Sequence, residues 1–105
     1  MEYQRHGGIA GFSNDLGVYS AGYALISTYN GHPAALKKIY LDAGQLKKLY
    51  RCLDTYQLIN YQQPAPANVA DGMSIALVVA GTGNKVASDQ DIRSMLNFAS
   101  GLATR

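Results

Sequence analysis

The sequence predicts a single α+β domain, residues 1–105, in which an antiparallel β-sheet of about four to five strands carries two helices packed on one face. Three observations support this fold class. The chain has 105 residues, which is near the usual size of one domain. Two segments repeat apolar residues at helical spacing after a capping residue. Most of the remaining chain has strand or turn patterns, and the expected element order is β-β-β-(β)-α-β-β-α.

The N-terminal part predicts a shaped loop and then a hairpin. After a short polar segment, three glycines within Gly7–Phe12 indicate positive φ angles or a close backbone approach. Residues 16–28 are rich in tyrosine and aliphatic residues and are interrupted at residues 20–22, which predicts a hairpin turn there. Beyond the turn both faces of the strand carry apolar groups, as expected for a strand that a helix covers on one side.

The middle of the chain predicts a turn, a strand and the first helix. Residues 30–33 have turn composition. Residues 35–41 are compatible with a strand or a helix, and we expect a strand because Ile39-Tyr40-Leu41 favours β-structure. Asp42 followed by Gln45 has the form of a capping box that opens a helix. The apolar stripe of this helix consists of Leu46, Leu49, Tyr50 and Leu53.

The next part predicts a loop and a second hairpin. Pro64 and Pro66 indicate an extended loop, because each fixes its own φ angle. Residues 73–80 alternate as a core strand. We expect residues 81–84 to close a hairpin from this strand onto residues 85–87.

A second helix is expected after Ser88 or Asp89, either of which can serve as its N-cap. Acidic residues at Asp89 and Asp91 lie in its first turn, where the helix dipole favours negative charge. Its buried stripe consists of Ile92, Met95, Leu96, Ala99, Leu102 and Ala103.

The composition excludes several classes of protein. With 48% apolar and 15% charged residues, the chain is too hydrophobic for intrinsic disorder. The net charge is +2, and the lysine pairs at residues 37–38 and 47–48 fall short of the basic stripe that nucleic-acid binding requires. The apolar run at residues 75–80 is far too short for a membrane span. Because the N-terminal residues lack the apolar stretch of a signal peptide, we expect a cytoplasmic protein or an exported one whose leader is absent.

The sequence lacks the motifs that accompany catalysis and metal binding. His6 and His32 have no metal-ligand spacing, and Cys52 lies in the apolar pattern of a helix without an evident histidine partner. No serine stands in a nucleophile elbow. The glycines at residues 7–11 and 81–83 lack the ending and the following helix of a phosphate-binding loop. We therefore expect a non-catalytic protein without a metal or a cofactor.

The aromatic residues indicate a binding surface. The chain has eight tyrosines and no tryptophan. Tyrosine suits binding surfaces because it buries a large ring at little entropic cost and keeps its hydroxyl in water. The tyrosines at element ends are Tyr29, Tyr40, Tyr56 and Tyr61. The alternative is that these rings only cover the edges of the sheet.

Three stretches resemble, in the same order and over nearly the whole chain, the emfourin family of small bacterial proteins. Arg5–Phe12 is similar to the family's opening, Arg-x-Gly-Gly-aromatic/aliphatic-Ala-Gly. Leu41–Leu46 with Leu49 is similar to the Leu-Ser/Asp-x-x-x-Leu start of the family's first helix. Asp71–Leu77, with the hairpin and helix that follow, is the third stretch. The glycine opening is the most specific of the three.

The founding member of that family inhibits protealysin and other thermolysin-like metalloproteases, so the resemblance implies a protein-binding domain with such a protease as partner. An inhibitor of this kind presents loops that the scaffold has ordered in advance. The candidate partner-binding residues are Ile9, Phe12 and Tyr29 as apolar anchors, with His32 as a possible zinc ligand. The alternatives are that Gly7–Phe12 is only a tight structural corner, and that the chain is a structural or interaction domain of the bacterial cell envelope that associates with itself. The sequence leaves the oligomeric state open.

Overall fold

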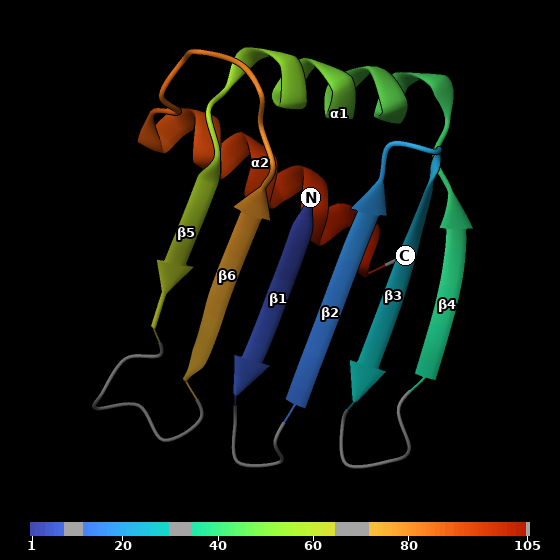
Figure 1. Ribbon diagram of the computed structural model, residues 1–105. Coiled ribbons are helices and arrows are strands. Elements are labelled where there is room, and N and C mark those ends of the chain that lie inside the picture. Colours follow the sequence, from blue (N-terminus) through green and yellow to red (C-terminus); the bar gives the residue numbers. More distant parts are fainter. Residues whose placement is uncertain (8–11, 30–34, 65–71, 105) are drawn as a thin grey trace.

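Six strands form one antiparallel sheet in the order β4-β3-β2-β1-β6-β5 (Figure 1). The computed structural model describes residues 1–7, 12–29, 35–64 and 72–104. The strands are β1 (Glu2–Gly7), β2 (Phe12–Tyr19), β3 (Tyr23–Tyr29), β4 (Ala35–Tyr40), β5 (Ile59–Gln63) and β6 (Met73–Val79). The predicted α+β class, with an antiparallel sheet and two helices in one compact domain, is confirmed. The predicted number of four to five strands is wrong.

The β2–β3 hairpin and β4 follow the prediction. Tyr19 pairs with Tyr23, so the turn occupies residues 20–22. Gly22 has a φ angle of 106°, a conformation that side-chain-bearing residues rarely adopt. The strand interpretation of residues 35–41 is confirmed by β4. The predicted turn at residues 30–33 and most of the two predicted loops, at Gly7–Phe12 and around Pro66, lie outside the described residues.

The predicted hairpin between residues 73–80 and 85–87 is wrong. Strand β6 pairs with β1 on one side and with β5 on the other, so neither of its edges is open to residues 85–87. Lys85 makes only an isolated bridge, with Tyr56. The strand that the sequence does not predict is β5, whose pairing with β6 takes the place of that hairpin.

Residues 81–85 bind the end of the first helix instead. The backbone N–H of Thr82 donates to the carbonyl of Leu53 at 2.8 Å, and that of Lys85 donates to the carbonyl of Thr55 at 3.0 Å. The last carbonyls of a helix have no partner within it, so this segment supplies the missing donors. The approach is close enough that a Cβ atom on Gly83 would lie 2.3 Å from the carbonyl oxygen of Asp54. Only glycine fits at that point.

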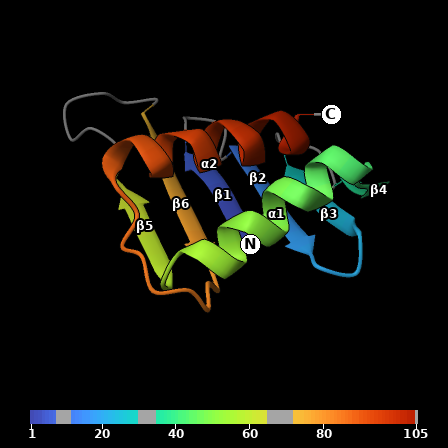
Figure 2. The same ribbon diagram turned by 90° about the horizontal axis from the view of Figure 1, so that it is seen from above.

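Both helices begin at predicted capping residues. Helix α1 (Ala43–Thr55) follows Asp42, helix α2 (Asp89–Ala103) follows Ser88, and each has a complete capping box. Helix α2 lies across one face of the sheet against β1 and β2, whereas α1 crosses the end of the strands nearest the β2–β3 turn (Figures 1 and 2). The two helices therefore close one side of the sheet, α2 over its face and α1 over its end.

The core lies between this one face and the helices. Every buried strand residue of the described chain belongs to the same face, from Tyr3 in β1 to Val79 in β6. The fully buried Leu49 joins the same cluster from α1. Tyr50, which the sequence places on the apolar stripe, is 44% exposed, and its hydroxyl donates to the carbonyl of Ser20 at 2.7 Å. The tyrosine in the core is Tyr3.

Candidate functional site

No helix of the described residues covers the second face of the sheet, which points toward the viewer in Figure 1. Its two halves differ in chemistry. Over β5, β6 and β1 it presents mainly amides and small side chains, such as Gln4, Gln62 and Ser74. Over β2, β3 and β4 it presents tyrosine and leucine side chains. The apolar half is the unusual one, because a solvated sheet face is ordinarily polar.

We call this apolar half the open-face patch. It consists of Tyr19, Tyr23, Leu25, Tyr29, Leu36 and Tyr40. The register explains why these residues gather: Tyr23 pairs with Tyr40, and Leu25 pairs with Lys38. Leu36 pairs with Ser27 and is therefore a diagonal neighbour of Leu25 on the same face. Leu36 is 82% exposed and Tyr40 is 72% exposed. The rings of Tyr19 and Tyr23 stack with their centroids 5.0 Å apart.

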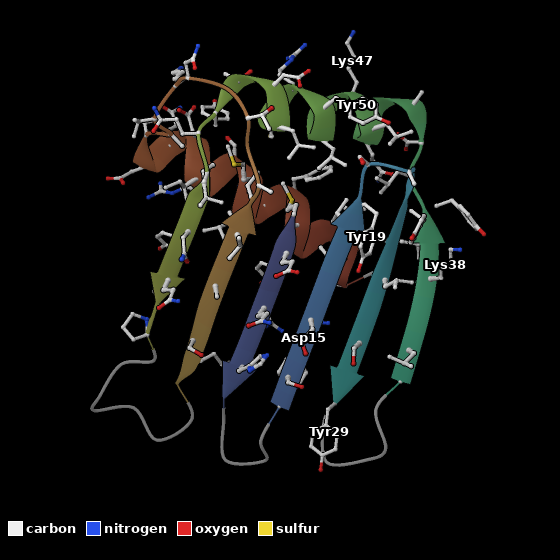
Figure 3. The ribbon with its side chains drawn as sticks, viewed as in Figure 1. Asp15, Tyr19, Tyr29, Lys38, Lys47 and Tyr50 are labelled. Carbon is white, nitrogen blue, oxygen red and sulfur yellow. The ribbon has the colours of Figure 1, made fainter. Side chains whose placement is uncertain are left out.

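Lys38 is the cation within the patch. Its Nζ lies 4.5 Å from the ring centroid of Tyr23 and 5.3 Å from that of Tyr40. Both distances are within the range of cation–π attraction. Figure 3 shows Lys38 on β4, across the sheet from Tyr19 on β2. The lysine therefore holds two tyrosine rings in place, and its aliphatic stem adds to the apolar surface.

The patch is hollowed beside Gly17. A depression of about 500 Å³ lies over β1 to β4, with Tyr19, Leu25 and Leu36 among its lining residues. Gly17 contributes no side chain, and the ring of Tyr19 bends over it: a Cβ atom at Gly17 would lie 3.1 Å from the Tyr19 hydroxyl oxygen. Asp15 lies at the other end of the depression (Figure 3). The patch thus has both a depression and exposed aromatic rings, which are features of a docking surface.

A histidine on β1 and an aspartate on β2 form a pair where the two halves meet. Nε2 of His6 lies 2.6 Å from a carboxylate oxygen of Asp15, and both side chains are exposed. The hydroxyl of Ser74 donates to the backbone carbonyl of His6 and so is not directed at its imidazole. Among residues 1–7, 12–29, 35–64 and 72–104, no three His, Cys, Asp or Glu side chains gather closely enough to hold a metal ion.

The predicted contact residues fall in different places. Ile9 and His32 lie outside the described residues. Phe12 begins β2 and is half-buried, and the guanidinium carbon of Arg5 lies 5.2 Å from its ring centroid. Phe12 alternates with the buried Asn14 and therefore lies on the helix side of the sheet. Tyr29 ends β3 on the open side and is 41% exposed, so of the two described candidates it is Tyr29 that belongs to the open-face patch.

Cys52 lies in a second depression, of about 650 Å³, between the two helices. Lys48 and Arg51 line it from α1, and Asp91 and Phe98 line it from α2. Burial raises the pKa of the Cys52 thiol, and the nearby Arg51 opposes this shift only in part. The thiol is therefore kept protonated, which does not suit a nucleophile.

The comparisons with known proteins do not name a relative. No protein-family model, curated protein or solved structure matches the chain. No helix in the described part of the chain is long and apolar enough to cross a membrane.

Sequence reasoning missed most of the open-face patch. It singles out Tyr29 and Tyr40 as tyrosines at element ends, but Leu25 and Leu36 become neighbours only through the β3–β4 register. One signal was available: Tyr23, Leu25 and Ser27 share one face of β3 while Ala24 and Ile26 share the other. A strand that is apolar on both faces needs a second cover, and two helices on one side cannot provide it.

Proposed function

We propose that this chain is a non-catalytic protein-binding domain that docks on a folded partner through the open-face patch. The observation that carries the proposal is the exposure of five large apolar side chains on one face of one sheet: Tyr19, Leu25, Tyr29, Leu36 and Tyr40. Contiguous apolar patches on soluble proteins mark interaction sites when a polar rim surrounds them. Here the polar half of the same face supplies part of that rim.

The chemistry of the patch favours a protein as the partner. Tyrosine is enriched where protein interfaces concentrate their binding energy, because its ring is large, rigid and amphipathic. Tyr19 and Tyr23 stack on each other, and Lys38 contacts the rings of Tyr23 and Tyr40, so these contacts favour one arrangement of the rings without a partner. Docking on such a surface loses little side-chain entropy.

The partner we propose is a thermolysin-like metalloprotease, the class that the resemblance to the emfourin family implies. Tyr29 supports this choice, because it is both a candidate anchor from the sequence and a member of the open-face patch. Tyr29 also ends β3 at the same end of the sheet as Phe12, which begins β2. An inhibitor that uses this end of the sheet would bury Tyr29 together with the adjacent part of the patch.

A second candidate function is self-association, as an interaction domain of the bacterial cell envelope. The same exposed leucines favour it, since two copies could cover each other's open faces. Sheets that pack face to face lie about 10 Å apart and interdigitate their side chains. The depression beside Gly17 would accept a side chain from a second copy.

An inhibition titration tests the proposal. Purified protein is added to a thermolysin-like protease while cleavage of a fluorogenic peptide is followed. We expect stoichiometric loss of activity with the chain left intact on a gel, and inhibition weakened by about tenfold or more in a Tyr29→Ala or Leu36→Asp variant. Val86→Asp, at an exposed apolar residue outside the patch, is the matched control. Digestion of the chain, or full activity at micromolar excess, would rule out the protease as partner.

A further inference from the structure

Strand β5 forms an edge of the sheet that carries no charge. In the described chain β5 pairs only with β6, so its outer side presents backbone N–H and C=O groups without strand partners. Residues 56–64 contain no charged side chain. Proteins ordinarily protect an edge strand with charges, and the opposite edge, β4, carries Lys37 and Lys38. The edge of β5 is therefore open to strand addition in a way that the edge of β4 is not.

A small pocket, lined by both apolar and polar side chains, adjoins this edge. Its volume is about 190 Å³, and its lining comes from β5 with the two residues before it, from the segment that leads into α2, and from α2 itself. The residues that line it are Gln57, Leu58, Ile59, Asn60, Tyr61, Val86, Ala87 and Ile92. Leu58 is 66% exposed and Val86 is 74% exposed, so two apolar side chains are available at the pocket, and Ile92 lies among its walls.

We propose that the β5 edge and this pocket bind an extended, uncharged peptide segment of a partner protein, which adds to the sheet as a seventh strand. Side chains alternate between the two faces of a strand, so every second side chain of the added segment points to the helix side. One of these, aliphatic or aromatic, enters the pocket beside Ile92. Backbone hydrogen bonds to β5 supply affinity and the pocket supplies specificity, as in other cases of strand addition.

A second copy of the chain fits this edge less well than a foreign peptide. If two β5 strands paired, the side chains directed to the helix side would be Ile59, Tyr61 and Gln63 of the other copy. Ile59 is buried in its own core, and the Tyr61 hydroxyl donates to Gln63 at 3.3 Å. Neither apolar side chain is free to fill the neighbour's pocket. This site also lies at the opposite edge of the sheet from the open-face patch and does not depend on the proposed function.

The test uses the full chain, labelled with ¹⁵N, and a capped peptide of alternating threonine and leucine with a lysine at each end for solubility. We expect saturable amide shifts confined to residues 58–63, Val86, Ala87 and Ile92, with a dissociation constant below about 1 mM. The same peptide with N-methyl groups on alternate residues cannot form the ladder and should give no shifts. A peptide with alanine in place of leucine should bind about tenfold more weakly, because it leaves the pocket empty.

Two variants separate this edge from the rest of the sheet. Val86→Asp places a charge at the rim of the pocket and should weaken the leucine peptide about tenfold or more, while leaving the fold intact because Val86 is exposed. Leu36→Asp, at the far edge, should leave binding unchanged. Three results would overturn the proposal. The first is amide shifts confined to the open-face patch, and the second is no shifts at a peptide concentration of several millimolar. The third is β5 amide shifts that change with protein concentration alone, which would mean that a second copy of the chain occupies the edge.

Discussion

At the scale of single residues, alanine substitutions at two glycines should change the stability of the protein in opposite directions. A Cβ atom at Gly83 would meet backbone atoms of Asp54 and Thr55 at 2.3 Å, whereas at Gly101, inside α2, nothing lies within 4 Å. Gly83→Ala should therefore destabilise the protein by about 1–3 kcal/mol. Gly101→Ala should stabilise it by about 0.5–1 kcal/mol, because alanine favours the helix. Urea denaturation of both variants measures this difference. Equal effects of the two changes would mean that residues 81–85 do not pack against the end of α1.

The thiol of Cys52 should make the stability of the protein depend on pH, and the direction of this effect follows from its pKa. Burial raises the pKa of its thiol above the ordinary value of 9.0. Because the folded protein then holds this proton more tightly than the unfolded chain, the thiol's contribution to stability is lost as pH rises above the ordinary value. Reaction with a disulfide reagent at pH 8 should be slower in the folded protein than in urea. A faster reaction in the folded protein would mean that the thiolate is stabilised instead.

Single residues were predicted well where the sequence itself determines their surroundings. The capping box at Asp42 follows from a local pattern and is present, and Ser88, one of the two expected N-caps of the second helix, serves as that cap. Burial of tyrosines was predicted poorly: Tyr50 lies on the apolar stripe of α1 yet is exposed, and Tyr3 lies in a polar segment yet is buried. Tyr3 is buried because β1 is central, between β2 and β6, and this placement follows from pairings that are distant in sequence.

At the scale of elements, the N-cap of α2 yields a further prediction. The Ser88 hydroxyl accepts from the backbone N–H of Asp91, and the Asp91 carboxylate accepts from the backbone N–H of Ser88. Ser88→Ala should cost about 0.5–2 kcal/mol of stability by denaturant titration. Asn97→Ala, on an exposed part of the same helix, is the control and should change little.

The stabilisation that this N-cap provides should depend on pH. The hydrogen bonds from Ser88 lower the pKa of Asp91 below its ordinary value of 3.8. A lowered carboxyl pKa means that the stabilisation is present above the ordinary value and is lost as pH falls through the lowered one. The difference in stability between an Asp91→Ala variant, which lacks the carboxylate, and the native sequence should therefore shrink in acid. A difference that stays constant between pH 7 and pH 2 would contradict this account of the cap.

The elements that sequence reasoning recovered are those with strong local patterns: both helices, the β2–β3 hairpin, β4 and β6. It missed β5 and misassigned residues 81–87. Gly81 to Asn84 have the composition of a hairpin turn, but here the chain uses those glycines to approach the end of α1. The unsatisfied carbonyls of a helix end compete with strand pairing for this segment, and a local pattern does not show which of the two wins.

At the scale of the whole molecule, six strands and two helices leave one side of the sheet without a cover. The class of fold follows from the alternation of patterns along the chain, but the uncovered face follows from the number of strands and the position of α2. The open-face patch was therefore visible in the sequence only as an excess of tyrosine and as apolar residues on both faces of β3. Its leucines, Leu25 and Leu36, come together through the β3–β4 register alone.

The measurement that tests the central claim most directly is sedimentation velocity of the native sequence and a Leu25→Asp/Leu36→Asp variant. Each is run alone from 1 to 100 micromolar (about the range of weak to moderate association) and then with an equimolar thermolysin-like protease. We expect the native sequence to form a complex with the protease or with itself, and the variant to remain a folded monomer in both runs. A native sequence that stays monomeric throughout, or a variant that associates as well as the native sequence does, would contradict the claim that the open-face patch is a docking surface.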